Sequence, residues 1–381
     1  MKKIQIRDAR ELVKTYGRSF FEEESGILYS DYTCGGFEFV FSGCLLTAEF
    51  DAIPDTMVPP QRNAFPGQEP PKREDWPYLA VVLDDGEEPV RKICVKKGEP
   101  VVLYFSETPE THKIRLVKLT ENFRTALGLV SLTMDGELLP YTPEKKEIIE
   151  FIGDSITCGF GNATGDVGHE FAASEEDGWM THGAIAARAL GMEPRFVSVS
   201  GISVETAPGM PGMYCMRDLY PYTDRILEDK LAERKGTKAE AYQPFDFAGN
   251  QASIVVLNLG TNDANQIYFS PDQEAAEERF QENYYRFVSE IRQLNGPDTT
   301  ILCALGCMDY YLFDKICAVV ERIKAETGDT RIHTLKYHKM MNIGPDAGAC
   351  LHPAIFRHKK MADDLVKCIR RLCPGNVQFG I

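Results

Sequence analysis

The chain contains a serine, an asparagine and a histidine in three short motifs that together could hydrolyse an ester. Ser155 lies in Gly-Asp-Ser at residues 153–155, Asn262 lies in Gly-Thr-Asn-Asp at residues 260–263, and His352 precedes a proline. A serine hydroxyl becomes a nucleophile when a base such as histidine removes its proton. An asparagine amide can stabilise the oxyanion that then forms on the acyl group. These residue types therefore predict serine esterase chemistry.

Each motif alone also has an ordinary structural interpretation. A serine after a strand often caps a helix, and Asn or Asp after a strand often forms a turn. The sequence around Ser155 is not the Gly-x-Ser-x-Gly elbow of α/β-hydrolases, because position 157 is threonine. Asp263 is expected to have only a structural role at the end of its strand. The specific signal is the combination of motifs and their order along the chain.

The residues before the first two motifs predict buried strands. Residues 148–152 form a short apolar run, and residues 253–259 have the sequence SIVVLNL. Apolar strands that alternate with helices from here to the end of the chain predict a parallel sheet with helices on both faces. Ligands of such sheets bind at the carboxyl ends of the strands. Ser155 and Asn262 are therefore expected to lie at that edge.

The first third of the chain has a different pattern. Short runs of β-forming residues alternate with turns, including Asp-Gly at residues 85–86 and 135–136, and helical periodicity is nearly absent. This pattern predicts an antiparallel β-sandwich of jelly-roll type over residues 1–142, followed by a catalytic α/β domain over residues 143–381. Six prolines in residues 59–77 predict a long surface loop whose role the sequence does not indicate.

The composition disfavours several classes of protein. The 42 basic and 57 acidic residues give a formal net charge of −15, which disfavours nucleic acid as a partner because phosphate binding needs a basic face. No apolar stretch reaches the length of a membrane span, and charged residues interrupt any signal-peptide core near the N-terminus. The 11 cysteines follow no disulfide or zinc pattern. We therefore expect a cytoplasmic protein with free thiols and no bound metal.

Four blocks of the sequence resemble a known superfamily. The two motifs around Ser155 and Asn262, together with Gly201 and the His-Pro pair, resemble the blocks of the SGNH, or GDSL-type, hydrolases. The sequence FIGDSITCGFG at residues 151–161 is more similar still to family-2 carbohydrate esterases, and the N-terminal part is similar to their jelly-roll domain. The resemblance implies a flavodoxin-like, three-layer α/β/α catalytic domain. It also implies removal of O-acetyl groups from xylan, manno-oligosaccharides or related sugars, without a cofactor.

The resemblance also assigns roles to single residues. Ser155 is the nucleophile that forms an acetyl-enzyme, and His352 is the base. The backbone N–H groups of Ser155 and Gly201 and the Asn262 side chain form the oxyanion hole. Because sugar rings stack on aromatic faces, three aromatic residues are candidate substrate contacts: Phe160, Trp179 and Tyr214. The alternative for each of the three is a place in the core.

One position departs from the pattern of the superfamily. Most members have Asp three residues before the catalytic histidine, and this chain has Ala349. A backbone carbonyl near Ala349 could orient His352 by accepting its Nδ1–H, and Asp346 is a second candidate. The site is therefore predicted to be a Ser155–His352 dyad whose third partner lies in the loop before the histidine.

Two other functions stay open from the sequence. A carbohydrate-binding protein with weak or no esterase activity would use the same residues to hold a glycan, so an acetylated mono- or oligosaccharide is the expected ligand in both cases. A nucleotide-binding enzyme is suggested by glycines at positions 159, 161 and 165. Their spacing matches neither a dinucleotide-binding nor a phosphate-binding loop. The sequence does not indicate an oligomeric state.

Overall fold

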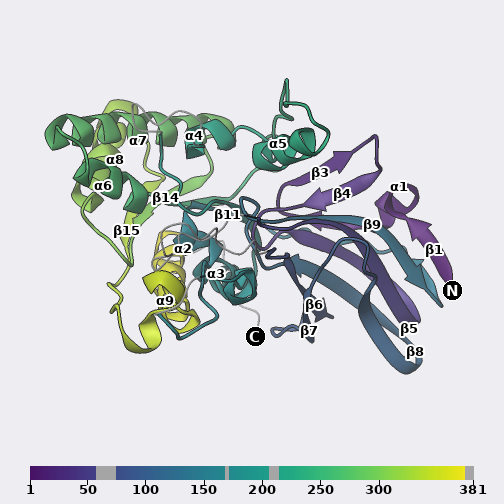
Figure 1. Ribbon diagram of the computed structural model, residues 1–381. Helices are drawn as coiled ribbons and strands as arrows, with labels where there is room; N and C mark the ends of the chain where they lie inside the picture. Colours follow the sequence, from purple (N-terminus) through teal and green to yellow (C-terminus); the bar gives the residue numbers. More distant parts are fainter. Residues whose placement is uncertain (57–73, 168–170, 206–213, 374–381) are drawn as a thin grey trace, which may run out of the picture.

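The computed structural model describes residues 1–56, 74–167, 171–205 and 214–373, and two sheets form its framework (Figure 1). A ten-stranded sheet contains strands from the N-terminal part of the chain, and a five-stranded sheet contains the later strands. Residues 59–73 of the predicted proline-rich loop lie outside the described residues. The predicted fold class, an antiparallel β domain followed by an α/β domain, is confirmed.

The first sheet is antiparallel throughout. Its strands are β1 Lys2–Gln5, β2 Lys14–Tyr16, β3 Ser19–Glu22, β4 Ile27–Ser30, β5 Gly36–Ile53, β6 Tyr78–Leu83, β7 Arg91–Cys94, β8 Val101–Lys118, β9 Ala126–Met134 and β10 Glu137–Leu139. They follow the order β3-β4-β9-β5-β8-β6-β7, with β1 paired to β9 and with β2 and β10 paired to β5. The short helix α1 Ile6–Ala9 and the 3₁₀ turn η1 Arg10–Leu12 follow β1. The jelly-roll assignment stays a prediction.

The core of this sheet comes from alternating residues of its long strands. Phe37, Phe39 and Phe41 of β5 are fully buried, as expected when every second side chain of a strand points to the same face. The register of β5 against β8 shifts after Gly43, which marks a bulge that bends the two strands. The bend lets a single sheet curve around its own apolar core (Figure 1).

The second sheet is parallel. Its strands are β11 Ile148–Gly153, β12 Glu193–Ser198, β13 Ile254–Asn258, β14 Thr300–Leu305 and β15 Ile332–Lys336, in the order β12-β11-β13-β14-β15. This is the strand order of flavodoxin-like folds. All residues of β13 and β14 are buried, because helices cover both faces of the sheet.

The helices lie on both sides of the parallel sheet (Figure 1). They are α2 Ser155–Cys158, α3 His182–Leu190, α4 Met216–Leu219, α5 Arg225–Arg234, α6 Thr261–Tyr268, α7 Gln273–Asn295, α8 Phe313–Thr327 and α9 Ile355–Leu372. Four 3₁₀ turns accompany them: η2 Ala173–Glu175, η3 Gly178–Met180, η4 Gly344–Asp346 and η5 Ala349–Leu351. Val255 and Leu257 of β13 pack toward α7 and α8, and Val256 packs toward α3 and α9. The C-terminal part is therefore a three-layer α/β/α structure.

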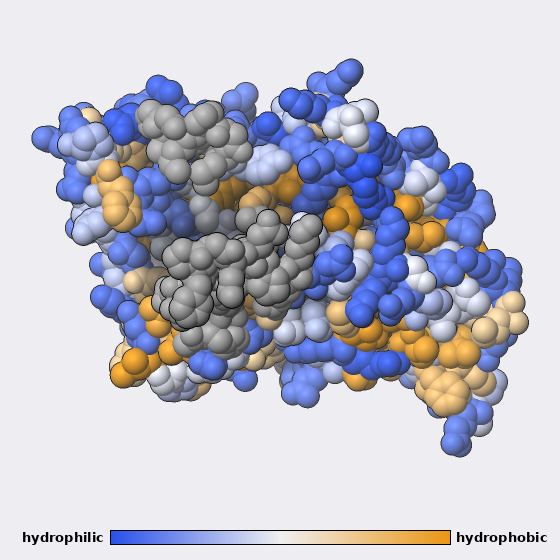
Figure 2. Space-filling view, viewed as in Figure 1, coloured by the Kyte–Doolittle hydropathy of each residue, from blue (hydrophilic) through white to orange (hydrophobic). Residues whose placement is uncertain are grey.

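The face of the molecule shown in Figure 2 is mainly polar. Hydrophilic residues cover most of the coloured surface in Figure 2. None of the described helices is long and apolar enough to cross a membrane.

A buried ion cluster joins the two sheets. The Glu150 carboxylate of β11 lies 2.7 Å from Arg195 Nε of β12 and 3.2 Å from Arg18 Nη2 of the N-terminal part. Burial alone would raise the pKa of Glu150, but the charges of Arg195 and Arg18 lower it. The chain passes from β10 to β11 between Leu139 and Ile148, and the domain boundary at residue 142 stays a prediction.

Candidate active site

Ser155 lies at the turn between β11 and α2, at the carboxyl end of its strand. The Asp154 carboxylate caps the helix by accepting a hydrogen bond from the Ile156 N–H at 3.0 Å. Gly159 ends the helix in the left-handed conformation, with a φ of 86°. A short helix that is capped at both ends therefore holds Ser155, which is 9 % exposed.

His352 is the hydrogen-bond partner of Ser155. Its Nε2 atom lies 2.9 Å from Ser155 Oγ, and its Nδ1 atom lies 3.2 Å from the Cys350 carbonyl oxygen. Burial lowers the pKa of His352 to about 4, so the ring is neutral at neutral pH. Because a carbonyl oxygen only accepts hydrogen bonds, Nδ1 carries the proton and Nε2 accepts one from the serine hydroxyl. A general base for Ser155 requires this tautomer.

A tight turn brings the Cys350 carbonyl to the imidazole of His352. Cys350 and Leu351 have φ angles of 49° and 62°, a left-handed conformation that costs a non-glycine residue roughly 1–2 kcal/mol. The Ala349 N–H donates to the Gly161 carbonyl at 3.0 Å, and the His352 N–H donates to the Ala349 carbonyl at 3.0 Å. The surrounding hydrogen bonds therefore hold the turn in a conformation that its own residues disfavour.

The carboxylate of Asp346 points to a different part of the structure. It accepts a hydrogen bond from the Met341 N–H at 2.9 Å and forms a buried ion pair with Arg357 of α9. In the part of the chain that the structure describes, it forms no hydrogen bond with His352. The hypothesis that a backbone carbonyl orients His352 agrees with this geometry. The hypothesis that Asp346 does so is wrong, because Arg357 already holds that carboxylate.

The segments that carry the predicted oxyanion donors lie together. The Asn262 Nδ2 atom donates to the Ile202 carbonyl at 2.9 Å and to Asp154 Oδ2 at 3.5 Å, so a ligand oxygen would replace the longer of these two contacts. It is therefore next to the neighbours of Ser155 and Gly201. Among the residues described, the backbone N–H groups of Ser155 and Gly201 donate to no protein acceptor. Within the described residues, no protein acceptor therefore competes with a ligand oxygen for these two groups.

The turn around Gly201 depends on a buried aspartate. Gly201 has a φ of 79°, and a side chain there would meet no atom within 4 Å. Asp263 accepts hydrogen bonds from the Val204 N–H at 3.1 and 3.3 Å, and burial raises the pKa of Asp263 to about 7. Asp263 therefore supports the segment after Gly201, which agrees with the structural role predicted for it.

One of the three predicted aromatic contacts lies at the site. The Phe160 ring packs against His352 with a centroid distance of 4.6 Å and stacks on Phe171 at 4.0 Å. Arg124, in the loop between β8 and β9, lies over both phenylalanine rings, and its charge contributes to the lowered pKa of His352. Nothing in the sequence pattern marks Arg124 as a neighbour of this site, since it lies between two strands of the other sheet.

The structure does not bring Trp179 or Tyr214 to the Ser155–His352 pair. Trp179 is 4 % exposed, donates its indole N–H to the Glu87 carbonyl at 2.9 Å, and has Arg188 over its ring. Tyr214 donates its hydroxyl to Asp229 of α5 at 2.7 Å. Packing against the N-terminal sheet fixes the Trp179 ring, and α5 fixes the Tyr214 ring. Of the two residues, Trp179 is the one that lies in the core, which is the alternative to a substrate contact.

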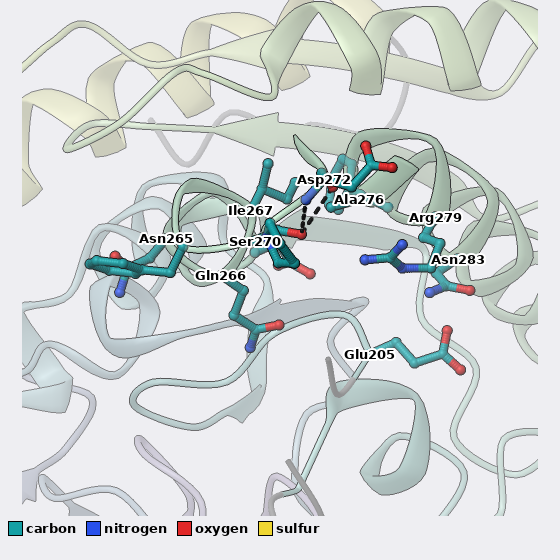
Figure 3. Close-up of a pocket in the computed structure, with 13 residues that line it drawn as sticks. Glu205, Asn265, Gln266, Ile267, Ser270, Asp272, Ala276, Arg279 and Asn283 are labelled. Atoms are coloured by element: carbon teal, nitrogen blue, oxygen red, sulfur yellow. Dashed lines mark hydrogen bonds between the residues drawn. The ribbon is translucent and has the colours of Figure 1, made fainter. Parts of the chain in front are cut away.

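A separate pocket of about 810 Å³ lies beside α6 and α7. Figure 3 shows Gln266, Arg279 and Asn283 grouped around this space. Asp263 lines the pocket, whereas the predicted catalytic and oxyanion residues are not among its described lining residues. Within the described ranges, no group of three or more His, Cys, Asp or Glu side chains could hold a metal ion.

Comparisons with known proteins identify relatives of the chain. It is 31 % identical over 307 residues to the cellulase/esterase CelE of Acetivibrio thermocellus, which covers 78 % of this chain and 34 % of that protein. The chain therefore spans about a third of the length of that relative. It is 26 % identical over 296 residues to an acetylxylan esterase/glucomannan deacetylase of Cellvibrio japonicus, which covers 76 % and 71 % of the two chains.

The fold also matches a solved structure over nearly its whole length. The acetyl xylan esterase Est2A of Butyrivibrio proteoclasticus superposes with a TM-score of 0.78 at 19 % identity, which covers 97 % of this chain and 98 % of that one. The model of the GDSL-like Lipase/Acylhydrolase family matches residues 151–354, which include Ser155, Gly201, Asn262 and His352. The family and its class of carboxylic ester hydrolases are those that the sequence motifs predict. The chain belongs to the GDSL-like lipase/acylhydrolase family.

Proposed function

We propose that the protein is a serine esterase that removes O-acetyl groups from acetylated sugars or oligosaccharides. The hydrogen bond of 2.9 Å between His352 Nε2 and Ser155 Oγ carries this proposal. A neutral imidazole at this distance from a serine hydroxyl supports general-base activation of the nucleophile.

In the first half-reaction, Ser155 Oγ attacks the acetyl carbonyl carbon while His352 Nε2 takes the hydroxyl proton. The carbonyl oxygen becomes an oxyanion, which the N–H groups of Ser155 and Gly201 and the amide of Asn262 stabilise. A single donor of this kind contributes on the order of 3 kcal/mol to the transition state. The imidazolium then protonates the sugar oxygen, the bond between that oxygen and the acetyl carbon breaks, and acetyl-Ser155 remains.

In the second half-reaction, water replaces the sugar. His352 removes a proton from the water as its oxygen attacks the acetyl carbon, and the same donors hold the second oxyanion. The imidazolium returns the proton to Ser155 Oγ, acetate leaves, and the free enzyme is restored. The Nδ1–H of His352 donates to the neutral Cys350 carbonyl throughout, and a carbonyl stabilises the imidazolium less than a carboxylate would. The base is therefore weaker than in a triad that contains an aspartate.

The relatives support an acetylated carbohydrate as the substrate. One is named an acetylxylan esterase/glucomannan deacetylase and another a cellulase/esterase. A neutral acetylated sugar is also compatible with a chain of formal charge −15, which would repel an anionic polymer. The choice between xylan-type and manno-type substrates needs a direct comparison of substrates.

The proposal is tested with Ser155→Ala on p-nitrophenyl acetate, with Arg279→Ala in the separate pocket as a matched control. We expect Ser155→Ala to lose nearly all activity and the control to keep the rate of the unaltered enzyme. Retention of more than about a few per cent of the rate by Ser155→Ala would contradict the nucleophile assignment. Acetate release from acetylated xylo-, manno- and gluco-oligosaccharides then identifies the substrate class. Binding of these sugars without any release of acetate would instead favour a carbohydrate-binding protein.

A further inference from the structure

The loop of residues 119–125, between β8 and β9 of the N-terminal sheet, reaches the catalytic part of the molecule. A fully buried cation anchors it, because Lys118 Nζ donates to the backbone carbonyls of Asp31 and Thr120 at 2.8 Å, Glu121 at 3.0 Å and Thr125 at 3.2 Å. A buried ammonium group with this many acceptors fixes the backbone around it. The loop is therefore a rigid support for the side chains that it carries.

The Glu121 side chain of this loop contacts two segments of the active site. Its Oε2 atom accepts a hydrogen bond from the Ser200 N–H at 2.7 Å and lies 3.5 Å from Cys158 Sγ. Ser200 directly precedes Gly201, and Cys158 belongs to α2, the helix that begins with Ser155. Burial raises the pKa of the Cys158 thiol, so the thiol stays protonated and donates to the carboxylate.

The charge of the buried Glu121 carboxylate is compensated locally. Arg124 Nε lies 3.3 Å from its Oε1 atom and links it to Asp55, whose Oδ2 lies 2.8 Å from Arg124 Nη1. Glu176 accepts a hydrogen bond from the Glu121 N–H at 3.1 Å. Burial, and then the charge of Glu121, raise the pKa of Glu176 well above its ordinary value, so Glu176 is the neutral member of the pair. The Glu121 side chain is therefore held by Arg124 at one oxygen and by Ser200 at the other.

The turn around Gly201 is held by hydrogen bonds and not by packing at the glycine. A side chain at Gly201 would meet no atom within 4 Å, so packing does not fix that residue. The turn is also held by a backbone hydrogen bond from Ile202 to Val199 at 3.3 Å, by the Asn262 amide on the Ile202 carbonyl at 2.9 Å and by Asp263 on the Val204 N–H at 3.1 Å. The bond from Ser200 to Glu121, at 2.7 Å, is the shortest of these and acts on the residue directly before Gly201.

We propose that Glu121 is a positioning residue for the oxyanion hole, through which the N-terminal sheet sets the direction of the Gly201 N–H relative to Ser155. The carboxylate holds the Val199–Ser200 peptide group, which lies one residue before the Gly201 N–H, and the far end of α2 at the same time. This inference rests on the proposed function, because the oxyanion hole has a role only if Ser155 forms an acyl-enzyme. It gives the N-terminal sheet a part in the chemistry that is separate from any part in sugar binding.

The test compares Glu121→Ala and Glu121→Gln with Thr125→Ala, a substitution in the same buried loop that removes the hydrogen bond from Thr125 Oγ1 to the Glu121 backbone carbonyl but leaves the Glu121 side chain in place. The kcat and KM for p-nitrophenyl acetate are measured per active site, counted by endpoint titration with a serine-reactive phosphonate, and the Tm of each variant is recorded. We expect Glu121→Ala to lower kcat on the order of tenfold to a hundredfold, a decrease no larger than the one caused by removing an oxyanion donor. The KM should change by less than about threefold. Glu121→Gln should recover part of this loss, since its amide oxygen can still accept from Ser200. Thr125→Ala should lower the Tm without changing kcat.

Unchanged kcat per titrated site in both Glu121→Ala and Glu121→Gln, with only a lower Tm, would overturn the inference and leave Glu121 as a structural residue. If Glu121→Ala fails to fold, Glu121→Gln decides, because a kcat equal to that of the unaltered enzyme contradicts the inference and a reduced kcat at a similar Tm supports it. Ser155→Ala in the same assay separates the two claims. If Ser155→Ala stays active, the proposed function fails. If Ser155→Ala is inactive while the Glu121 variants are normal, only the positioning role fails.

Discussion

The turn that carries Ser155 and the turn that carries His352 fix their side chains by different means. In the first, the Asp154 carboxylate caps α2 and a glycine in the left-handed conformation ends it. In the second, two non-glycine residues adopt the left-handed conformation, and a hydrogen bond from Ala349 reaches across to the Gly161 carbonyl. The serine turn is therefore stabilised mainly by its own local sequence, with one contact from Glu121 at the far end of α2, whereas the histidine turn depends on contacts from other parts of the chain.

This difference separates two kinds of substitution. Changes that remove a reacting group should abolish turnover in either turn, since both groups act as one unit. Changes in the supporting contacts should matter more at the histidine turn, because its backbone conformation is unfavourable without them.

The largest difference in kcat is expected between His352→Ala and Asp346→Asn. His352→Ala removes the base, so we expect kcat to fall on the order of a thousandfold or more. Asp346→Asn weakens the ion pair with Arg357 and should lower the free energy of unfolding by roughly 1–3 kcal/mol, with kcat of the folded protein less than about tenfold lower. Steady-state kinetics and urea unfolding of both variants check this. Equal losses of kcat in the two variants would mean that Asp346, and not the Cys350 carbonyl, orients the histidine.

The contact between the two turns is tested by Gly161→Ala. Gly161 has a φ of 61°, and a Cβ there would lie 2.6 Å from Ala349 Cβ, so the two turns would be pushed apart. We expect kcat/KM to fall on the order of tenfold, because a displacement of about 1 Å in a catalytic group has effects of this size or larger. Gly165→Ala is the matched control, since a Cβ at Gly165 meets nothing within 4 Å. A normal rate in Gly161→Ala would show that the histidine turn holds its position without this contact.

The activity at low pH should depend on the protonation of His352, which is neutral at neutral pH. Burial lowers the pKa of His352 from its ordinary value of 6.5 to about 4, and the protonated ring cannot accept the serine proton. Activity should therefore be lost as the pH falls through about 4, and it should be nearly complete at pH 6. Acetate release measured between pH 3 and pH 8 tests this. An acid limb with its midpoint near 6.5 would show that His352 is not held in a buried, neutral state.

Cys350→Gly is expected to have the smallest effect on kcat and on the free energy of unfolding. Glycine relieves the cost of the left-handed conformation at position 350, but it also raises the entropy of the unfolded chain. The two effects offset each other, so we expect the free energy of unfolding to change by less than about 1 kcal/mol. The backbone carbonyl remains, and kcat should stay within about twofold of the value for the unaltered enzyme. A large loss of kcat would instead assign a role to the Cys350 side chain.

The sequence predicted the parts of the site that follow local rules. The apolar runs before Ser155 and Asn262 form β11 and β13, neighbouring parallel strands, so the two motifs reach one sheet edge. The four motif residues carry the family resemblance, and a missing acid at Ala349 already indicated a backbone carbonyl.

The remaining features depend on contacts between distant segments. No residue type marks the Cys350 carbonyl as an acceptor, because every residue has a carbonyl. Trp179 was a candidate substrate contact on its residue type, but its place depends on how the N-terminal sheet packs against η3. Glu121 belongs to a loop of that other sheet, and its approach to Ser200 appears only in the tertiary structure.

Locating the acetyl group during turnover tests whether it is transferred to Ser155 with His352 as the base. The enzyme is mixed with p-nitrophenyl acetate, the reaction is quenched with acid during turnover, and its peptides are analysed by mass spectrometry. We expect an acetyl group on the peptide that contains Ser155, and none on the corresponding peptide of Ser155→Ala. Normal turnover with Ser155 unmodified and the acetyl group on another residue would contradict this expectation.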